Sequence, residues 1–357
     1  MLQITLLPAR EGDCILLSYG TSRADRHVLI DGGRASTWKD LKKHLKGIEQ
    51  DKLAIELFVV THVDRDHIEG ALKFVQDPDF KVEVKDVWFN GYKHLIETEN
   101  EAFGVAQGEK FSDAIQGRKW CWNKAFGGGP ARLDSRDMPQ IVHLDGGLKL
   151  TLLSPTKAAL ASLERDWRRW LLNAGIDRSQ RAARETEDPG PFEVFGALDV
   201  EQLAKTPESL DDGIPNGSSI AFLAEFEGRS ILCAVDAHPD ILTQSIRKIV
   251  GPEGRLKVDI FKIPHHGSQR NITTELLNLI DCKQFVISTN GAIHNHPDDV
   301  AIARIIKAVS EHKILIFNYD QPRTTVWNAK SLKQKYNYEC CFPSAEDDGT
   351  ISIQVEP

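Results

Sequence analysis

The chain has 357 residues, of which 41% are hydrophobic and 27% are charged, and its formal net charge is −8 at pH 7. This length and composition are those of a globular protein with a full hydrophobic core, and no apolar run approaches the ~20 residues of a membrane-spanning helix. The composition therefore excludes a transmembrane protein. The acidic balance excludes a chain that binds nucleic acid through its overall charge.

Short apolar runs separated by turns predict an alternation of strands and helices at the start of the chain. Strands are expected at 2–8, 14–20, 27–33, 53–62 and 82–91, and helices at 36–50 and from about residue 69.

Two segments interrupt this alternation. Residues 92–139 are polar, Gly-rich and partly helical, and residues 156–213 combine a charged amphipathic helix with an acidic loop that contains proline. Between them, residues 141–155 predict a hairpin with its turn at 145–147. We therefore expect two helical or loop insertions.

The alternation resumes from residue 218 and continues to about residue 319, and 350–357 predict a last strand. Strands alternating with helices are typical of a layered α/β protein. The sequence therefore predicts an α/β fold organised as a single domain over residues 1–357, with the two insertions.

Cysteine spacing and the N-terminal stretch indicate the compartment. Six cysteines are scattered without a C-x-x-C pair, which is typical of reduced thiols and signals neither a disulfide framework nor a zinc–cysteine site. The stretch MLQITLLPAREGDCILLSYG lacks a basic start and a small-residue cleavage site. We expect no export signal, no membrane association and a cytoplasmic location.

The stretch THVDRDHIEG, residues 61–70, gathers four potential metal ligands directly after a predicted strand. They are His62, Asp64, Asp66 and His67. Imidazole and carboxylate groups suit zinc, manganese or iron(II), and a further bridging carboxylate allows such a cluster to hold two ions. An acidic, His-rich loop is often only a solvated turn, so the hypothesis depends on ligands elsewhere in the chain.

Three later strand ends carry side chains of the same type. The runs ILCAVDAH, DIFKIPHHGS and VISTNGAIHNHPD deliver Asp236, His265, His266, His294 and His296. Enzymes of the α/β class assemble sites in this way because the sheet fixes the geometry while the loops vary. We expect His294, like His238, to be a surface residue.

In their order along the chain these motifs resemble the metallo-β-lactamase family, whose signature is H-x-H-x-D-H. The closer resemblance is to its branch found in the DNA-uptake competence protein ComEC, where the second His is an Asp. The stretches EGDCILLSYG, VLIDGG, NGSSIAFLAEFEGRSILCAVDA, IPHHGS and HNHP are similar to motifs of that branch. Glu69 and Asn295 depart from it where glycine is usual. The resemblance implies an αββα four-layer sandwich of the metallo-β-lactamase fold.

The resemblance also implies two divalent metal ions. One would be held by His62 and Asp64 and the other by Asp66, His67 and His266, with Asp236 bridging them. His266 is preferred to His265 because the second His of a His-His-Gly turn is usually the ligand in such relatives.

The family usually supplies one more His to the first ion. The only His in the corresponding interval is His143, whose setting IVHLDGG does not look like the family's ligand loop. Asn216 instead occupies the place that the ComEC branch fills with a polar side chain. We expect Asn216 to contact substrate.

Several residues keep two interpretations. Asp31 either caps the following helix or anchors the ligand loop. His265 and His296 are predicted to act in catalysis together with Asp66, although His265 could be a structural His and His296 a ligand. Ser268 either contributes a hydroxyl to substrate or caps the next helix.

The run RDWRRW in the second insertion also has two interpretations. It predicts an amphipathic helix with Trp167 and Trp170 facing the body of the protein and arginines facing water. Alternatively, its arginines and tryptophans form a lid over a nucleic-acid strand. GRKWCWNK in the first insertion has the same two interpretations.

Two divalent ions that share a carboxylate and a water make hydrolysis possible near neutral pH. Asp64 in place of an imidazole adds negative charge and a harder ligand, which favours manganese or magnesium over zinc and phosphodiesters over amides. We predict a metal-dependent phosphodiesterase or nuclease using a metal-bridging hydroxide, with manganese or zinc bound and magnesium compatible. The alternatives are an acyl hydrolase acting on a lactam, lactone or thioester, and a non-catalytic metal-stabilised adaptor that binds protein partners through the insertions.

Overall fold

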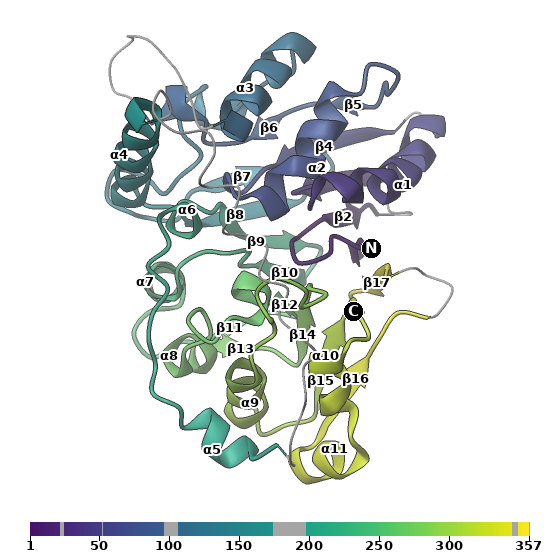
Figure 1. Cartoon of the computed structure of the whole chain (residues 1–357), viewed down its shortest axis with the longest axis vertical. Helices are drawn as coiled ribbons and strands as arrows, with labels where there is room; N and C mark the ends of the chain where they lie inside the picture. The colour runs from purple at the N-terminus through teal and green to yellow at the C-terminus, as the bar shows by residue number, and fades with distance from the viewer. Residues whose placement is uncertain (22–24, 52, 96–105, 174–197, 345–348, 357) are drawn as a thin grey trace.

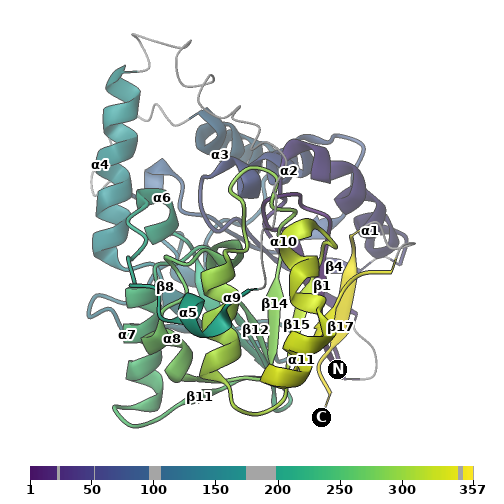
Figure 2. The ribbon, with the colours of Figure 1, turned by 60° about the horizontal axis from the view of Figure 1, so that its bottom comes forward.

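The computed structural model describes residues 1–21, 25–51, 53–95, 106–173, 198–344 and 349–356. Two large β-sheets pack face to face, and helices cover the outer face of each (Figure 1). The first sheet belongs to the N-terminal third of the chain, apart from one strand supplied by the C-terminus. The second sheet is built by the remainder (Figure 2).

The first sheet has seven strands. The C-terminal strand and the first three strands of the chain pair antiparallel. The fourth strand pairs parallel to the third, and the fifth and sixth strands pair parallel to the fourth. In spatial order the strands are β17 (Ile351–Gln354), β1 (Leu2–Leu6), β2 (Ile15–Tyr19), β3 (Arg26–Ile30), β4 (Ala54–Val59) and β5 (Glu83–Val84), with β6 (Val87–Trp88) also on β4.

The second sheet has eight strands. The hairpin strands at one edge are antiparallel, and the strands from β10 onward are parallel. In spatial order they are β16 (Tyr338–Cys341), β15 (Lys313–Phe317), β14 (Gln284–Ile287), β12 (Ile260–Lys262), β10 (Arg229–Cys233), β9 (Ala221–Phe226), β8 (Lys149–Ser154) and β7 (Ile141–His143). A small separate pair is formed by β11 (Leu256–Lys257) and β13 (Ile280–Asp281).

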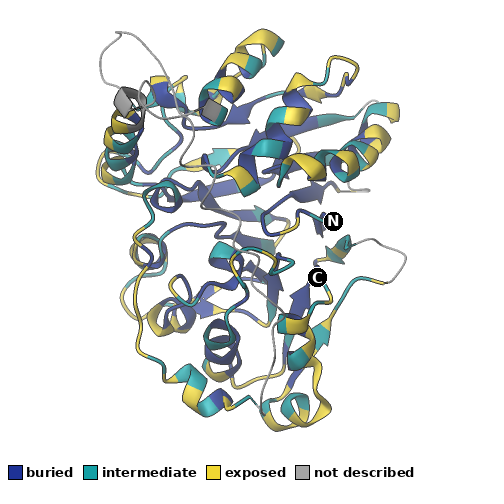
Figure 3. Cartoon of the chain, viewed as in Figure 1, coloured by how far each residue is buried: buried dark blue, intermediate teal, exposed yellow. Residues whose placement is uncertain are grey.

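Three apolar clusters hold the four layers together. One lies between the sheets and joins side chains such as Leu17 and Leu57 to Phe222 and Val286. The other two lie between each sheet and its helices, so the central strands are buried on both faces (Figure 3). Continuous apolar runs such as LFVV, rather than a strict alternation, are what such strands require. The predicted αββα four-layer sandwich is confirmed.

The outer layers are made of amphipathic helices. The helices over the first sheet are α1 (Trp38–Gln50), α2 (Arg65–Gln76) and α3 (Ala106–Arg118), with α4 (Lys157–Asn173) beside them. Those over the second sheet are α5 (Val200–Ala204), α7 (Pro239–Val250), α8 (Thr274–Asn278) and α9 (Asp299–Ala308). Short helices complete the chain at α6 (Ile214–Gly217), α10 (Pro322–Thr325) and α11 (Lys330–Tyr336), and as 3-10 turns at η1 (Ala35–Thr37), η2 (Tyr92–His94), η3 (Lys124–Phe126), η4 (Pro264–Gly267) and η5 (Val326–Asn328).

The two predicted insertions carry η2, α3 and η3 in 92–139, and α4 and α5 in 156–213. Trp167 of α4 is buried and its ring lies 5.8 Å from that of Tyr92, while Arg165 and Arg168 are exposed. This is the pattern of an amphipathic helix. The side chain of Trp170 lies outside the described residues. Among the described helices, none has the length and apolar character needed to cross a membrane.

One boundary differs from the prediction. The helix expected from about residue 69 begins at Arg65, so Asp66 and His67 belong to its first turn and not to a loop. The partial positive charge at a helix N-terminus favours an acidic residue such as Asp66 there. The ligand-type side chains of this segment are consequently held on a regular element.

Candidate metal centre

The His and Asp residues singled out in the sequence converge at one edge of the sandwich, between the two sheets. His62 and Asp64 follow β4, and Asp66 and His67 open α2. From the second sheet, Asp236 follows β10, and the turn η4 after β12 carries His265 and His266. The carboxyl ends of parallel strands meet at the same edge, which is why residues far apart in sequence become neighbours.

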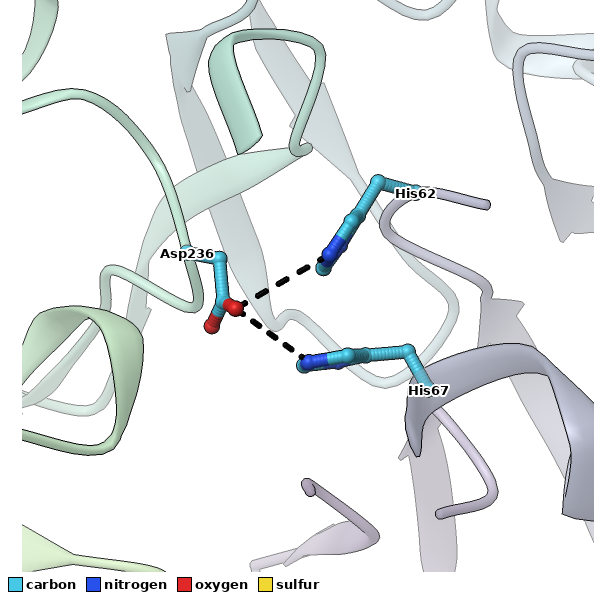
Figure 4. Close-up of side chains that lie close together, drawn as sticks. All are labelled: His62, His67 and Asp236. Carbon is cyan, nitrogen blue, oxygen red and sulfur yellow. Dashed lines mark ion pairs between the residues drawn. The ribbon is translucent and has the colours of Figure 1, made fainter. Parts of the chain in front are cut away.

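Asp236 lies between imidazoles of the first sheet. Its Oδ2 is 3.3 Å from Nε2 of His67 and 3.8 Å from Nε2 of His62 (Figure 4). The carboxylate of Asp64 completes this side of the cluster, with its Oδ2 3.6 Å from Nε2 of His62. The group His62, His67 and Asp236 therefore presents nitrogen and oxygen atoms toward one small volume.

A second group forms around His266. Its Nε2 lies 3.6 Å from Oδ1 of Asp236, 3.7 Å from Oδ2 of Asp66 and 3.3 Å from Nε2 of His67. Asp66 and His67 with His266 form a second set of ligand-type atoms, and His67 and Asp236 border both sets. This placement brings together the six residues that we predict as ligands.

The chemistry of the donors fits divalent metal ions. Each of the three imidazoles uses Nδ1 at its back: His62 toward the hydroxyl of Thr61, His67 toward Asp31, and His266 toward the backbone carbonyl of Ser288. Nε2 is thereby left facing the cluster in each ring, as in metal sites with oriented ligands. Nε2 of His62 and Oδ1 of Asp236 are buried and have no hydrogen-bond partner in the described part of the chain, a situation that an ion would relieve.

The contacts of Asp31 decide between its two interpretations, a cap of the following helix or an anchor of the ligand loop. Its Oδ1 accepts from the backbone N–H of Thr61 at 2.8 Å, and its Oδ2 accepts from the Thr61 hydroxyl and from Nδ1 of His67, both at 2.8 Å. Helix α1 is not capped by this residue. Asp31 anchors the ligand loop, because one buried carboxylate ties the end of β4 to the first turn of α2.

Asp64 differs from the other members of the cluster in its exposure. Its side chain is 43% exposed, whereas the imidazoles beside it are buried. It occupies the N-cap position of α2, yet its side chain makes no capping hydrogen bond. The carboxylate is therefore available to the cleft, which it lines.

Charge in the cluster is mutually stabilised. Burial alone would raise the pKa of Asp236, but the surrounding imidazoles hold that pKa well below its usual range; they belong to His266, His67 and His265. Asp66 behaves in the same way, since burial raises its pKa and the neighbouring imidazoles lower it further. Conversely, burial lowers the pKa of His67, but the carboxylates around it raise that pKa well above its ordinary value. The carboxylates of Asp236 and Asp66 are therefore ionised, and a bound divalent ion would neutralise their negative charge.

Backbone conformation fixes the pair of adjacent imidazoles. His265 and His266 both have left-handed φ angles, 46° and 53°, and Gly267 follows at 89°. Such angles are strained for residues with side chains and occur where a site requires them. The turn directs His266 into the buried cluster and leaves His265 at its rim, so the two neighbours face different surroundings.

A cleft of about 430 Å³ opens above the cluster. Its walls are polar, and they are formed by Asp64, Asp66, Asp211, Asn216, Asp236, His265, Ser268, Gln269, Arg270, His294, His296 and Asp298. Five carboxylates and a single arginine make this an acidic cleft. The predicted catalytic and substrate-contacting residues Asp66, His265, His296, Asn216 and Ser268 all line it.

Three cleft-side residues were missed in the sequence. Asp211 accepts from Nδ1 of His265, Asn271 also faces that nitrogen, and Asp298 lies 3.5 Å from Nδ1 of His296. The signal for them was weak: Asn271 and Asp298 are polar residues close to the HHGS and HNHP motifs, and Asp211 comes shortly before the glycine and proline of DDGIP. Burial lowers the pKa of His296 despite Asp298, whereas Asp236 and Asp211 outweigh burial and raise that of His265 to about 9.

The structure also places the other residues considered in the sequence. Ser268 is not the cap of the next helix, because Thr273 accepts from the backbone N–H of Leu276 and caps α8 instead. His143 is exposed on the edge strand β7 and lines no part of the cleft. His238, expected at the surface, is half-buried, and its Nε2 donates to the carbonyl of Gly213 at 2.9 Å. His294 is exposed but does line the cleft.

Strand order, four layers and a His–Asp cluster at the edge shared by both sheets define a protein of the metallo-β-lactamase fold with a candidate metal centre. Over 157 residues the chain is 24% identical to ComE operon protein 3 of Bacillus subtilis, a match that spans 42% of this chain and 19% of that protein. This similarity agrees with the resemblance of the motifs to the ComEC branch. No family model matches the sequence.

A solved structure, the metallo-beta-lactamase fold protein YhfI from Bacillus subtilis, aligns over 99% of this chain and 100% of its own. The TM-score is 0.41 and the sequence identity 10%. At this level the alignment carries no argument, and the fold is assigned from the topology and the position of the motifs.

Proposed function

We propose that this protein is a metal-dependent hydrolase that cleaves phosphodiesters and, more specifically, that it is a nuclease. The observation that carries the proposal is the position of Asp64, an exposed carboxylate 3.6 Å from Nε2 of His62, where an imidazole would make a zinc site. Oxygen ligands favour harder ions such as manganese or magnesium, which pair with phosphate oxygens. The match to ComE operon protein 3 supports the same branch of the fold.

In this proposal His62 and Asp64 would hold one divalent ion, and His67, His266 and Asp66 would hold a second, with Asp236 within reach of both groups. Such ions would lower the pKa of a water and offset negative charge on the attacked phosphoryl group. Asp236 keeps its carboxylate ionised under the influence of the three imidazoles around it. Asp31 and Ser288 hold the rings in place through their back nitrogens.

The rim of the cleft supplies proton transfer and substrate contacts. We assign proton donation to the leaving oxygen to His265, with His296 as the second candidate; the two rings lie 5.5 Å apart. Asn216 and Ser268 line the same cleft and are assigned to substrate binding. Because five aspartates line the cleft, a phosphodiester is expected to bind only when divalent ions neutralise them.

The test compares two assays on the same protein. Manganese-loaded protein is given bis(p-nitrophenyl) phosphate, single-stranded DNA and RNA, and zinc-loaded protein is given a chromogenic lactam. We expect cleavage of a phosphodiester with manganese, and loss of both activity and bound metal in Asp64→Ala and Asp236→Ala. The exposed Asp79→Ala serves as the matched control and should keep both.

Full phosphodiester cleavage by either active-site variant would disprove the site. Faster turnover of the lactam with zinc would identify an acyl hydrolase. A protein that binds metal but cleaves none of these substrates would favour the adaptor, with the insertions as surfaces for a protein partner.

A further inference from the structure

Asp211 lines the cleft, faces the back of the first candidate catalytic imidazole, His265, and belongs to none of the ligand-type groups of the described cluster. It lies in the loop between α5 and α6, at the end of the segment expected to be an insertion. We propose that Asp211, assisted by Asn271, is the positioning residue that orients His265 so that Nε2 is the nitrogen presented to the cleft. This inference rests on the proposed function of His265.

The contacts around His265 indicate that Nδ1, the ring nitrogen facing away from the cleft, carries a proton. Nδ1 lies 3.2 Å from Oδ2 of Asp211 and 3.0 Å from Oδ1 of Asn271. Both of these partners present acceptor oxygens, and Nδ2 of Asn216, 3.4 Å from the same nitrogen, already donates to Asp211 at 2.8 Å, so Nδ1 is the N–H donor. The other nitrogen, Nε2, points toward the centre and lies 3.7 Å from Oδ2 of Asp236.

Asp211 is itself held rigidly. Its side chain is only 6% exposed, and Oδ2 accepts from Nδ2 of Asn216 at 2.8 Å and from Nδ2 of Asn271 at 3.0 Å. Oδ1 accepts from the backbone N–H of Gly213 at 2.9 Å. A carboxylate saturated by donors stays ionised and keeps one orientation, which is what a group that positions another requires.

The loop that carries Asp211 is clamped to the chain just beyond the HHGS motif. Arg270 donates to the carbonyl of Leu210 at 2.7 Å, and the N–H of Asp211 donates to the carbonyl of Arg270 at 3.2 Å; the ion pair of Arg270 with the exposed Asp212 contributes little to this clamp. The distance between Asp211 and His265 is therefore set by the backbone on both sides. The other His–Asp pair of the cleft, His296 with Asp298, is longer, at 3.5 Å.

Asn216 gains a second role from this geometry. Its Nδ2 donates to Asp211, so the residue predicted to touch substrate is linked through one carboxylate to the residue predicted to move a proton. When Nε2–H of His265 gives its proton to the leaving oxygen as the P–O bond breaks, the ring keeps its Nδ1–H bond to Asp211. The ring is thus neutral and still in place after the step.

The test uses Asp211→Asn, which keeps the volume but replaces the carboxylate by an amide, and His265→Gln. The matched control is Asp212→Asn, which removes the same charge from the next residue, whose side chain is 87% exposed. All variants are compared with wild type for thermal unfolding and bound manganese, which are expected to be unchanged in Asp211→Asn.

The first measurement is NMR of the imidazole N–H protons in metal-free, 15N-His-labelled protein, with the His265 signal assigned by its absence in His265→Gln. A proton donated to a carboxylate resonates far downfield, so the signal should move upfield or disappear through exchange in Asp211→Asn and stay in place in Asp212→Asn. A signal that does not move in Asp211→Asn overturns the proposal, whatever the protein hydrolyses.

The second measurement is kinetic. We expect Asp211→Asn to lower kcat about 10- to 100-fold on a dinucleotide, whose leaving alkoxide needs a proton, with KM within about twofold of wild type. The loss on bis(p-nitrophenyl) phosphate should be under about threefold, because p-nitrophenolate leaves without a proton. Equal losses on both esters, or an equal loss in Asp212→Asn, overturn the proposal. If wild type cleaves no phosphodiester, the proposed function fails, and the NMR measurement decides the positioning role.

Discussion

Asp64 has the strongest influence on which metal and which substrate this centre accepts. It makes no capping bond, it is partly exposed, and it lies beside the buried Nε2 of His62. Its carboxylate is hard and anionic, whereas the imidazole usual at this position in the fold is neutral and softer. Changing that one side chain should therefore change metal preference without changing the fold.

We predict that Asp64→His shifts the centre toward zinc. The ratio of the zinc and manganese dissociation constants should move at least about 10-fold in favour of zinc, because imidazole suits zinc better than a hard carboxylate does. Manganese-dependent phosphodiester cleavage should fall in parallel. Competition titrations against a chelating dye measure the ratio, and Asp79→His, an exposed position outside the cluster, is the control. An unchanged ratio would show that Asp64 is not a ligand.

A second influential pair lies behind the cluster. Lys262 and Asp13 are fully buried, with Nζ and Oδ2 2.9 Å apart, and Nζ also donates to the carbonyl of Ile263 at 3.1 Å. The other oxygen of Asp13 lies 3.8 Å from Nδ1 of His266. The pair links β12 to the loop before β2, and each partner neutralises a charge that would otherwise be isolated in the core.

Lys262→Met should destabilise the protein by about 3–5 kcal/mol, because it leaves the Asp13 carboxylate buried and unpaired. The double variant Asp13→Asn with Lys262→Met should recover much of that loss. Urea denaturation measures both. The surface pair Lys149–Glu225, with both side chains 36% exposed, is the control, and Lys149→Met should change the free energy of unfolding by under about 1 kcal/mol. Similar losses in the two lysine variants would contradict the explanation.

Helix α2 is placed against the first sheet by contacts that only glycine permits. A Cβ on Gly70 would lie 1.9 Å from the carbonyl oxygen of Gly32, and one on Gly12 would lie 1.8 Å from that of Asp66. Two backbone hydrogen bonds seal the approach, from Gly32 to His67 at 2.9 Å and from Gly70 to Gly33 at 2.8 Å. The first turn of α2, which carries two predicted ligands, is thus positioned by backbone packing.

Gly70→Ala should displace α2 and weaken metal binding as well as stability. The clash is with backbone atoms that cannot move aside, so we expect a loss of about 2–4 kcal/mol in the free energy of unfolding and at least about 10-fold weaker manganese binding. Gly47→Ala in α1 is the control, since nothing lies within 4 Å of its added Cβ. That variant should be stabilised by roughly 1 kcal/mol through helix propensity. Wild-type metal affinity in Gly70→Ala would disprove the role of this contact.

The first sheet also buries a histidine away from the metal centre. His27 of β3 shares a hydrogen bond of 2.9 Å with Ser18 of β2, and its Nε2 has no partner among the described residues. Burial lowers the pKa of this ring to about 4. The folded protein therefore keeps His27 neutral over a pH range in which the unfolded chain, with a pKa of about 6.5, binds a proton.

This difference between the folded and unfolded pKa of His27 lowers the stability of the protein as the solution becomes more acidic. Between about pH 6.5 and pH 4 the unfolded state gains a proton that the folded state does not, so the free energy of unfolding decreases as pH falls through that window. His27→Gln should remove on the order of 2–3 kcal/mol of that decrease. Urea denaturation of wild type and variant at several pH values between 7 and 4 measures the two slopes. Parallel curves would show that His27 is not the responsible group.

The local pattern of the chain was sufficient for a layered α/β protein and for the motif-bearing strand ends, because strand and helix periodicity and turn residues are properties of neighbours in sequence. The αββα four-layer sandwich was implied by the resemblance to the metallo-β-lactamase family. The local pattern also placed His62, Asp64, Asp66 and His67 in one cluster, since they lie within six positions of each other. The resemblance of the later motifs to the metallo-β-lactamase family added Asp236 and His266. A shift of the start of α2 to Arg65 was missed because helix ends depend on packing as well as on sequence.

Only the tertiary structure decided what surrounds these groups. Asp211 and His265 are 54 positions apart, and Asp13 and Lys262 are 249 positions apart. No periodicity relates residues at such separations; their contact follows from how the two sheets, the η4 turn and the clamped loop pack in three dimensions. The same packing showed that Asp31 anchors the ligand loop and that Thr273, not Ser268, caps α8. Residue types and their order thus predict a metal centre. The hydrogen-bond partners, burial and charge states of its residues are set only when segments distant in sequence pack together and exclude water.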